Sequence, residues 1–267
     1  MIEFLTEIFD TGLKVSSLGV IRSALSDTLG TLDGHILGQH PTIIRLLDGM
    51  AALRPAKYKD PPRWNVDTVL EHILTWGDNM HMDMRKLTLK LTMLFALATA
   101  ARCNELADLR SNLVYRTKDG IRFKLEKHRK QRKSSEYPGY LDIPSFPQQP
   151  LLCPVSCYDW YMIKTAGHRL KEEDDYVFRA MSQPYGKVAT STISRWLSTC
   201  ISETGYDDSN HPTAHSVRGA AATKAMMAGL STKQIMSAVE WKSESVYYDH
   251  YRNQEFNPEF GRSVLKP

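Results

Sequence analysis

The chain has 267 residues, enough to form one large domain or two modest ones and to bury a real hydrophobic core. Lysine and arginine total 34 against 30 aspartate and glutamate residues, which gives a net charge of +4 and a sequence pI near 8.8. This balance is only mildly basic, so a case for nucleic-acid binding depends on where the charges lie.

Cysteine usage and hydropathy exclude other classes of protein. The four cysteines do not have the paired spacing of a zinc site, and their small number favours a reduced intracellular protein. No signal peptide is expected, because Glu3, Glu7 and Asp10 interrupt the start of the chain. The longest apolar run, residues 87–101, contains Lys90 and is too short for a membrane span, so it predicts a buried core helix.

Residues 1–54 predict a small helical domain. Apolar residues recur at helical intervals, a glycine-containing connection follows, and another helix is expected to begin at Pro41. The predicted apolar positions of the first part are Phe4, Ile8, Leu18, Ile21 and Leu25.

Residues 55–63, with the sequence PAKYKDPPR, predict a linker between two domains. Three prolines remove backbone donors and stiffen the chain, and the charged residues keep the segment solvated. An ordinary surface loop within one domain is the alternative. With the boundary placed here, residues 64–267 form the second domain.

The second domain begins with two predicted helices. One is capped by Asn65 and runs to Trp76, and the core helix starts near Met84. The core helix leads into the sequence TAARCNELADL, in which Arg102 stands three residues before Glu105. An arginine at this place can pack its stem and present its guanidinium group to a phosphate. A solvated salt bridge between the two side chains is the alternative.

Three short strands are predicted next, over residues 113–115, 121–125 and 140–143. Asp119 and Gly120 have the sequence of a hairpin turn between the first two strands. The densest basic run in the chain, EKHRKQRKSSE, lies between the second and third strands. A solubilising loop and a nuclear localisation signal are two interpretations of this run.

The following segment predicts two more helices. Cys153 and Pro154 open a helix to about residue 166, and a later helix is expected to be capped by Thr190 or Ser191. Residues 174–178 predict a short extended piece between them. Arg195, in the later helix, fits a contact with a DNA backbone and a solvated surface position equally well.

The stretch HSVRGAAATKAMMAGLSTKQIMSAVEWKSESVYYDHY, residues 215–251, organises the rest of the chain. His215 and Arg218 are three residues apart on a predicted helix, so their side chains share a face. Gly229 is expected to end this helix and Ser231 to cap the next. Trp241 follows, and an aromatic cluster comes after it, formed by Tyr247, Tyr248 and Tyr251. A structural histidine and a packed aromatic core are the alternatives.

The order of these motifs resembles the catalytic domain of the tyrosine recombinases: an arginine box, a basic hairpin, H-x-x-R, Trp and then Tyr. The sequences HSVRGAAAT and W-x-S-E-S are most similar to the integrases of eukaryotic retroelements of the DIRS and Ngaro type. The resemblance implies a mainly α fold with a small antiparallel β-sheet (α+β), in which a helical core-binding domain precedes the catalytic domain. Residues 1–54 are short for a core-binding domain, so the chain is expected to begin partway through it.

The resemblance also implies an activity, namely site-specific cleavage and rejoining of DNA through a covalent 3′-phosphotyrosyl intermediate, without metal or cofactor. It assigns the nucleophile to Tyr251, with Tyr247 as a packed aromatic residue. A free tyrosine has a pKa near 10 and is a poor nucleophile, so an electropositive pocket has to favour its phenolate form. Arg102 and Arg218 supply that pocket through charge-assisted bonds to the non-bridging phosphate oxygens.

The remaining roles follow from the same resemblance. His215 donates to the phosphate or manages the proton of the nucleophile, and Trp241 packs and donates its indole N–H. Glu105 orients its neighbours. Lys130 protonates the leaving 5′ oxygen, with Lys127 and Lys133 as alternatives in the same loop. The expected DNA-binding residues are Lys127, Arg129, Arg132, Lys133 and Arg195.

The expected partners are double-stranded DNA and further copies of the chain, in a homo-tetramer on paired sites that passes through a Holliday junction. The tail carries Phe256, Phe260, Val264 and Leu265 at near-helical intervals and is expected to dock into a neighbouring protomer, with packing in cis as the alternative. No membrane partner is expected. The expected location is intracellular, and nuclear in a eukaryotic host. The protein is expected to belong to a transposable element.

Two other functions share parts of this pattern. A type IB topoisomerase has such a site but relaxes supercoiled DNA as a monomer. A DNA-binding module that has lost catalysis keeps the basic residues and not the complete set of candidate catalytic side chains.

Overall fold

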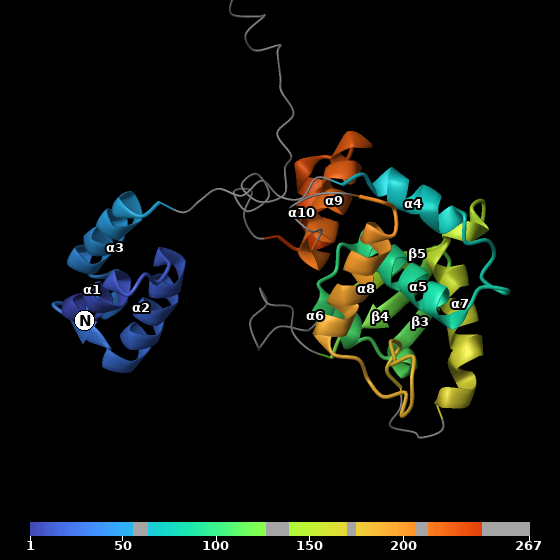
Figure 1. Cartoon of the computed structure of the whole chain (residues 1–267), viewed down its shortest axis with the longest axis horizontal. Coiled ribbons are helices and arrows are strands. Elements are labelled where there is room, and N and C mark those ends of the chain that lie inside the picture. The colour runs from blue at the N-terminus through green and yellow to red at the C-terminus, as the bar shows by residue number, and fades with distance from the viewer. Residues whose placement is uncertain (56–63, 127–138, 170–174, 207–212, 242–267) are drawn as a thin grey trace, which may run out of the picture. The chain divides into compact units, whose positions relative to one another are not determined.

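The computed structural model describes residues 1–55, 64–126, 139–169, 175–206 and 213–241. The chain divides into two compact units, Met1–Asp60 and Pro61–Pro267 (Figure 1). The division falls within the segment predicted as a linker, residues 55–63. The basic run after Glu126 and the whole segment after Trp241, including the tyrosine cluster and the tail, lie outside the described residues.

The described residues of the first unit form three α-helices, a two-stranded hairpin and a short 3₁₀ helix. They are α1 (Ile2–Asp10), α2 (Val15–Leu29), β1 (Thr31–Leu32), β2 (His35–Ile36), η1 (Leu37–Gln39) and α3 (Pro41–Leu53). The core consists of Leu5, Phe9, Leu18, Ile43, Leu47 and Met50. The predicted start of a helix at Pro41 is confirmed. The prediction that Phe4 lies on the apolar face is wrong, because Leu5 and Phe9 form the buried side of α1 and leave Phe4 44% exposed.

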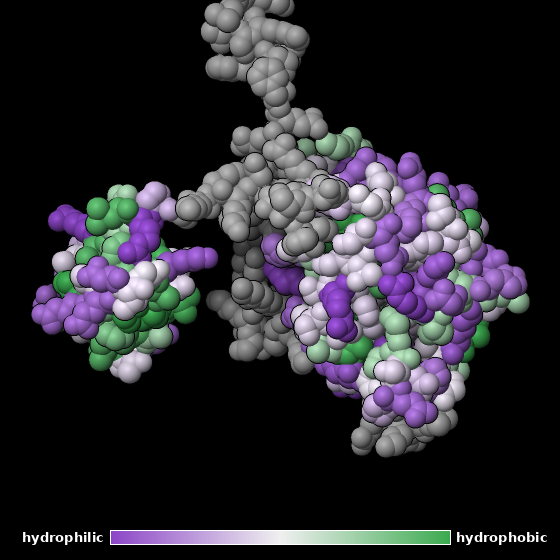
Figure 2. Space-filling view, in the orientation of Figure 1, coloured by the Kyte–Doolittle hydropathy of each residue, from purple (hydrophilic) through white to green (hydrophobic). Residues whose placement is uncertain are grey.

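Two polar contacts close the first unit. The Gly38 N–H donates to Ser26 Oγ at 2.9 Å, and a β-carbon at Gly38 would lie 2.9 Å from Ser26 Cβ, so the close approach requires glycine. Arg54 Nη1 donates to the carbonyls of Phe9 and Leu13, which ties the end of α3 to α1. Large apolar side chains remain exposed on this unit, and Figure 2 shows hydrophobic patches on its visible face.

The second unit is mainly helical, with one small sheet. Its elements are α4 (Val66–Leu74), α5 (Met84–Thr99), α6 (Cys103–Ala107), η2 (Ser111–Leu113), β3 (Val114–Thr117), β4 (Gly120–Lys124), β5 (Tyr140–Pro144), η3 (Pro150–Leu152), α7 (Pro154–Thr165), η4 (Ala166–His168), α8 (Thr190–Ser202), α9 (Ala214–Met227) and α10 (Thr232–Val239). The described residues therefore form the expected α+β fold (Figure 1).

Helix α5 is the centre of the second unit, and α7, α8, α9 and β5 pack against it. The Asp83 side chain caps its start by accepting from the Lys86 N–H at 2.9 Å. Every residue from Leu87 to Ala96 is buried, so the predicted core helix is confirmed. In the part of the chain that the structure describes, no helix has the length and apolar character needed to cross a bilayer.

Lys90 is fully buried within α5. Its Nζ atom has no hydrogen-bond partner among the described residues, and burial lowers the pKa of its ammonium group. Cys157 on α7 acts electrostatically on Lys90, and burial raises the pKa of the Cys157 thiol to about 12. A buried ammonium group in these surroundings costs folding free energy.

The sheet has the order β3-β4-β5 and is antiparallel throughout. Buried and exposed residues alternate along β5 and along β4 from Ile121 onward, and the inward-facing ones include Ile121, Phe123, Leu141 and Ile143. The predicted hairpin between the first two strands is confirmed, but its turn residues are Lys118 and Asp119, because Gly120 already pairs with Thr117 as the first residue of β4. Gly120 has a φ of 156°, and a β-carbon there would lie 2.1 Å from the Ile143 carbonyl oxygen.

Several predicted helix ends are confirmed and others are wrong. Asn65 Oδ1 caps α4 at 2.8 Å from the Asp67 N–H, but α4 ends at Leu74 instead of Trp76. Ser231 caps α10 as predicted. Neither Thr190 nor Ser191 caps α8: these are its first helical residues, and the N-cap residue is Ala189. Thr190 lies one position and Ser191 two positions too late to be the N-cap residue.

Candidate active site

Helix α9 brings His215 and Arg218 to the site. Thr213 is its N-cap residue, and the Thr213 Oγ1 atom accepts from the Ser216 N–H at 3.3 Å. His215 lies in the first turn and is exposed, whereas Arg218 is only 3% exposed. The helix therefore presents an imidazole at the surface and holds a guanidinium group in the interior one turn later.

The Arg218 guanidinium group joins three segments of the chain. Its Nη1 atom donates to the carbonyl of Ala100, and its Nη2 atom donates to the carbonyl of Val239 at 2.7 Å. The guanidinium carbon also lies 5.3 Å from the centre of the Trp241 ring, a cation–π distance. Arg218 thus fixes the turn after α5, the end of α10 and the buried Trp241 against one another.

Ala100 connects this contact to Arg102. Ala100 adopts the left-handed conformation at the C-terminus of α5, with a φ of 46°, and two residues later Arg102 is the N-cap residue of α6. The carbonyl that Arg218 holds therefore belongs to the turn that places Arg102. The backbone from Ala100 to Arg102 therefore links the position of Arg102 to that of Arg218.

Glu105 holds Arg102 from the other side. One Glu105 oxygen accepts from the Arg102 backbone N–H at 3.0 Å, and the other accepts from Arg102 Nη1 at 2.9 Å. The Glu105 side chain is 5% exposed and that of Arg102 21% exposed. The contact is therefore a largely buried pair, not the solvated surface pair considered as the alternative, and it restricts the guanidinium group of Arg102.

A cavity of about 400 Å³ lies beside this site. Its walls come from the end of α5, from β5, from α9 and from α10, including Ala100 and Val239, whose carbonyls Arg218 holds. The α9 wall is made of Ala221, Ala222 and Ala225, and these short side chains leave the space open.

The structure brings only part of the predicted site together. Arg102 pairs with Glu105, Arg218 lies against Trp241, and the backbone from Ala100 to Arg102 joins the two pairs, with His215 exposed on the same helix as Arg218. Arg195 lies on α8 and is exposed. The other predicted site residues lie outside the described residues: Tyr251, Lys127, Arg129, Lys130, Arg132 and Lys133.

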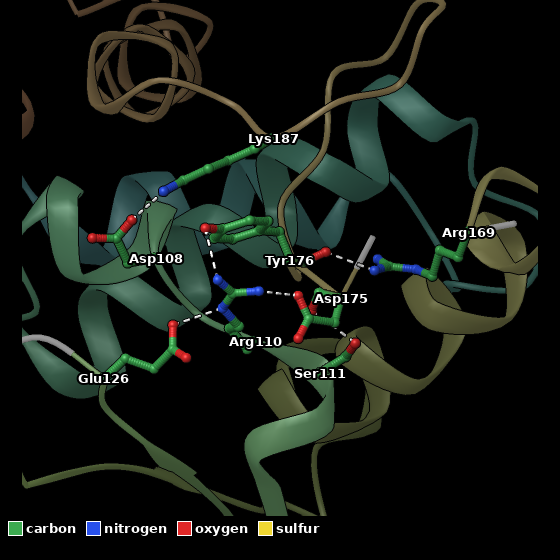
Figure 3. Close-up of polar contacts among 8 residues, drawn as sticks. All are labelled: Asp108, Arg110, Ser111, Glu126, Arg169, Asp175, Tyr176 and Lys187. Carbon is green, nitrogen blue, oxygen red and sulfur yellow. Dashed lines mark hydrogen bonds and ion pairs between the residues drawn. The ribbon is translucent and has the colours of Figure 1, made fainter. Parts of the chain in front are cut away.

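A polar network around Arg110 was not predicted (Figure 3). Arg110 Nε donates to Glu126 at 2.6 Å, Nη2 donates to the Tyr176 hydroxyl at 3.0 Å, and Nη1 donates to Asp175. Burial opposes the charge of Arg110, but the hydrogen bonds that Arg110 donates to Asp175 and Glu126, with the negative charges of those two residues, outweigh it and raise the pKa of Arg110. Lys187 lies over the same Tyr176 ring at 4.3 Å.

This network holds Glu126, two residues after the end of β4, by its bond to Arg110. Its partners are 16, 65 and 66 residues from Arg110 in the sequence. No local spacing pattern could have indicated them. The only sequence signal was the predicted extended piece at residues 174–178, whose Tyr176 forms an isolated β-bridge with Arg110.

The fold is shared with several solved structures. The lambda integrase(75-356) dimer bound to a COC' core site matches with a TM-score of 0.53 and 18% identity, over 96% of this chain and 80% of that chain. XerH site-specific recombinase bound to palindromic difH substrate matches with a TM-score of 0.58 and 14% identity, over 92% and 69%. The Tn1549 transposon integrase in complex with transposon right end DNA matches with a TM-score of 0.65 and 10% identity, over 99% and 82%.

These structural similarities show that the chain has the fold of the integrases and Xer recombinases. The family is shown by the comparison of sequences. No curated protein matches the chain. The model of the phage integrase family matches residues 67–257. The chain belongs to the phage integrase family. The predicted tyrosine recombinase family is thereby confirmed, whereas the affinity to DIRS and Ngaro elements stays a prediction.

Proposed function

We propose that this protein is a site-specific DNA recombinase that cleaves and rejoins DNA through a covalent 3′-phosphotyrosyl intermediate. The observation that carries the proposal is the contact of Arg218 with the Ala100 and Val239 carbonyls and with the Trp241 ring. This contact links Arg218 to Trp241 and to the turn that leads from Ala100 to Arg102, the second family-typical arginine.

The two arginines bind the scissile phosphate in this scheme. A guanidinium group carries five N–H donors and can hold main-chain carbonyls and a phosphate oxygen at once. Arg102, restricted by Glu105, contacts a second phosphate oxygen. Donors fixed in this way stabilise the charge that develops in the transition state without reorganising.

Proton transfer and nucleophilic attack fall to residues around this pair. His215 is exposed at the start of α9, where it can reach a bound phosphate, and the Trp241 indole N–H is a further donor. Tyr251 is the proposed nucleophile, and Lys130 protonates the leaving 5′ oxygen. The phosphotyrosyl bond conserves the energy of the cleaved bond, so rejoining requires neither ATP nor a cofactor.

Phosphate contacts are proposed for the second unit. Residues 1–54 contain four lysine and arginine residues against six aspartate and glutamate residues, a negative balance that disfavours a dominant role in binding the DNA backbone. The proposed backbone contacts are Lys127, Arg129, Arg132, Lys133 and Arg195. Affinity for duplex DNA is then expected to fall steeply as salt rises.

Assembly as a homo-tetramer on two duplexes completes the proposal, with exchange through a Holliday junction. The apolar tail residues between 256 and 265 are proposed to dock into a neighbouring protomer, and the cavity beside α9 and α10 is the proposed receptor. The proposed setting is a mobile element of the DIRS or Ngaro type, with a nuclear location in a eukaryotic host.

A nicked suicide duplex tests the covalent step, because loss of the short fragment beyond the nick prevents rejoining. Wild-type protein and Tyr248→Phe are expected to form a covalent complex on a denaturing gel. Tyr251→Phe is expected to bind the duplex with wild-type affinity and to form none. The assignment of the nucleophile is overturned if Tyr251→Phe traps DNA and Tyr248→Phe does not.

A further inference from the structure

Trp64 lies between Asp60, the last residue of the first unit, and Val66, the first residue of α4. Its side chain is buried, and its indole N–H donates to Ser216 Oγ at 2.8 Å. The two residues are 152 positions apart in the sequence. A buried indole N–H requires a hydrogen-bond partner, and here the partner is on the helix that carries His215 and Arg218.

Ser216 lies between those two site residues, in the first turn of α9. Its hydroxyl group donates to the Thr213 carbonyl at 2.7 Å while it accepts from Trp64. Its backbone N–H donates to Thr213 Oγ1. The Trp64 indole is thus bonded to the hydroxyl group that closes the N-terminal turn of α9.

A second contact joins the same two segments further along α9. Lys224 forms an ion pair with Asp67, which lies in the first turn of α4. A cavity of about 400 Å³ is lined on one side by residues 64–67 and on the other by Ala220, Thr223, Lys224 and Met227. The same two segments also meet in the hydrophobic core, to which Trp64 and Val66 on one side and Ala214 and Val217 on the other belong.

We propose that Trp64 is a positioning residue for His215 and Arg218, which couples the end of the inter-unit segment to the active-site helix through Ser216. This inference rests on the proposed function. A hydrogen bond at the first turn of α9 sets the direction in which the helix begins. Displacement of Trp64 therefore moves the His215 imidazole and the Arg218 guanidinium group together.

The test is single-turnover cleavage of the nicked suicide duplex at saturating DNA. Trp64→Phe keeps an aromatic ring and removes the donor, and Ser216→Ala removes the acceptor. Each is expected to slow cleavage about three- to tenfold, the range for one neutral hydrogen bond, with little change in duplex affinity. The double variant is expected to be no slower than the slower single variant, because both remove the same bond.

Two further variants separate positioning from general loss of structure. Ser216→Thr keeps a hydroxyl group and is expected to cleave close to the wild-type rate. Trp160→Phe, a half-buried tryptophan on α7, is the matched control and is expected to leave the rate unchanged. The inference is overturned if Trp64→Phe and Ser216→Ala cleave like wild type, if their effects multiply in the double variant, or if Trp160→Phe slows cleavage equally. In each of these cases the proposed function still stands as long as the wild-type protein cleaves the duplex. If the wild-type protein forms no covalent complex, both the proposed function and this inference are overturned.

Discussion

Arg218→Lys is the substitution for which the structure gives the clearest magnitude. The guanidinium group spans the carbonyls of Ala100 and Val239 and lies against the Trp241 ring. A lysine ammonium group is a point charge without the planar fork and cannot hold both carbonyls in this geometry. At least one charge-assisted hydrogen bond is lost, and such a bond contributes about 1.5–3 kcal/mol.

The expected effect on catalysis follows from that figure. If the lost bond places the phosphate-binding group in the transition state, single-turnover cleavage slows roughly tenfold to 150-fold. The melting temperature is also expected to fall, by about 3–12 °C for a unit of this size. The cleavage rate is measured on the suicide duplex at saturating DNA, and stability is measured by circular dichroism.

Arg179→Lys is the matched control for this experiment. Arg179 is also 3% exposed, and its Nε atom donates to the Tyr185 carbonyl at 2.6 Å, in a loop that supplies none of the proposed catalytic residues. It is expected to lose stability in the same range and to cleave at the wild-type rate. The reasoning is refuted if Arg218→Lys cleaves DNA as fast as wild type, or if Arg179→Lys loses as much activity.

Three further substitutions test other parts of the structure. Lys90→Met is expected to raise the free energy of unfolding by about 1–3 kcal/mol, because it removes a buried ammonium group. Burial lowers the pKa of Lys90 in the folded protein below its unfolded value, which is near 10.4. Between these two pKa values the unfolded state binds more protons, so the free energy of unfolding of the wild-type protein rises with pH. The stability advantage of Lys90→Met in chemical unfolding is therefore expected to shrink toward pH 10. Glu105→Gln is expected to slow cleavage about tenfold and leave duplex affinity nearly unchanged, because Arg102 loses its charged partner; equal cleavage rates refute this role. Gly120→Ala is expected to destabilise the protein by more than about 1 kcal/mol because of the clash with the Ile143 carbonyl, and an unchanged melting temperature contradicts that account.

Local sequence signals predicted the local structure well. The Asn65 and Ser231 caps and, to within one residue, the hairpin turn before Gly120 were predicted from residue type, because a cap or a tight turn is determined by a few neighbouring backbone groups. The length and apolar character of the α5 segment likewise predicted a buried helix.

Predictions that depended on packing were less accurate. Phe4 is exposed although it belongs to an apolar helix, because the packing of α2 and α3 against Leu5 and Phe9 decides which face is buried. The partners of Arg218 are main-chain carbonyls 118 and 21 residues away, and a carbonyl has no sequence signature. The bond between Trp64 and Ser216 could not be predicted either, because its two side chains are 152 positions apart in the sequence.

The central claim is that two guanidinium groups gather a DNA phosphate for attack by a tyrosine near the C-terminus. Peptide mapping of the covalent complex by mass spectrometry tests it most directly, after digestion of both the protein and the trapped duplex. The account predicts a nucleotide adduct on Tyr251 through a 3′ phosphate. It also predicts that Arg218→Lys forms much less of this adduct than the control variant Arg179→Lys. An adduct on another residue, or on a 5′ phosphate, contradicts it.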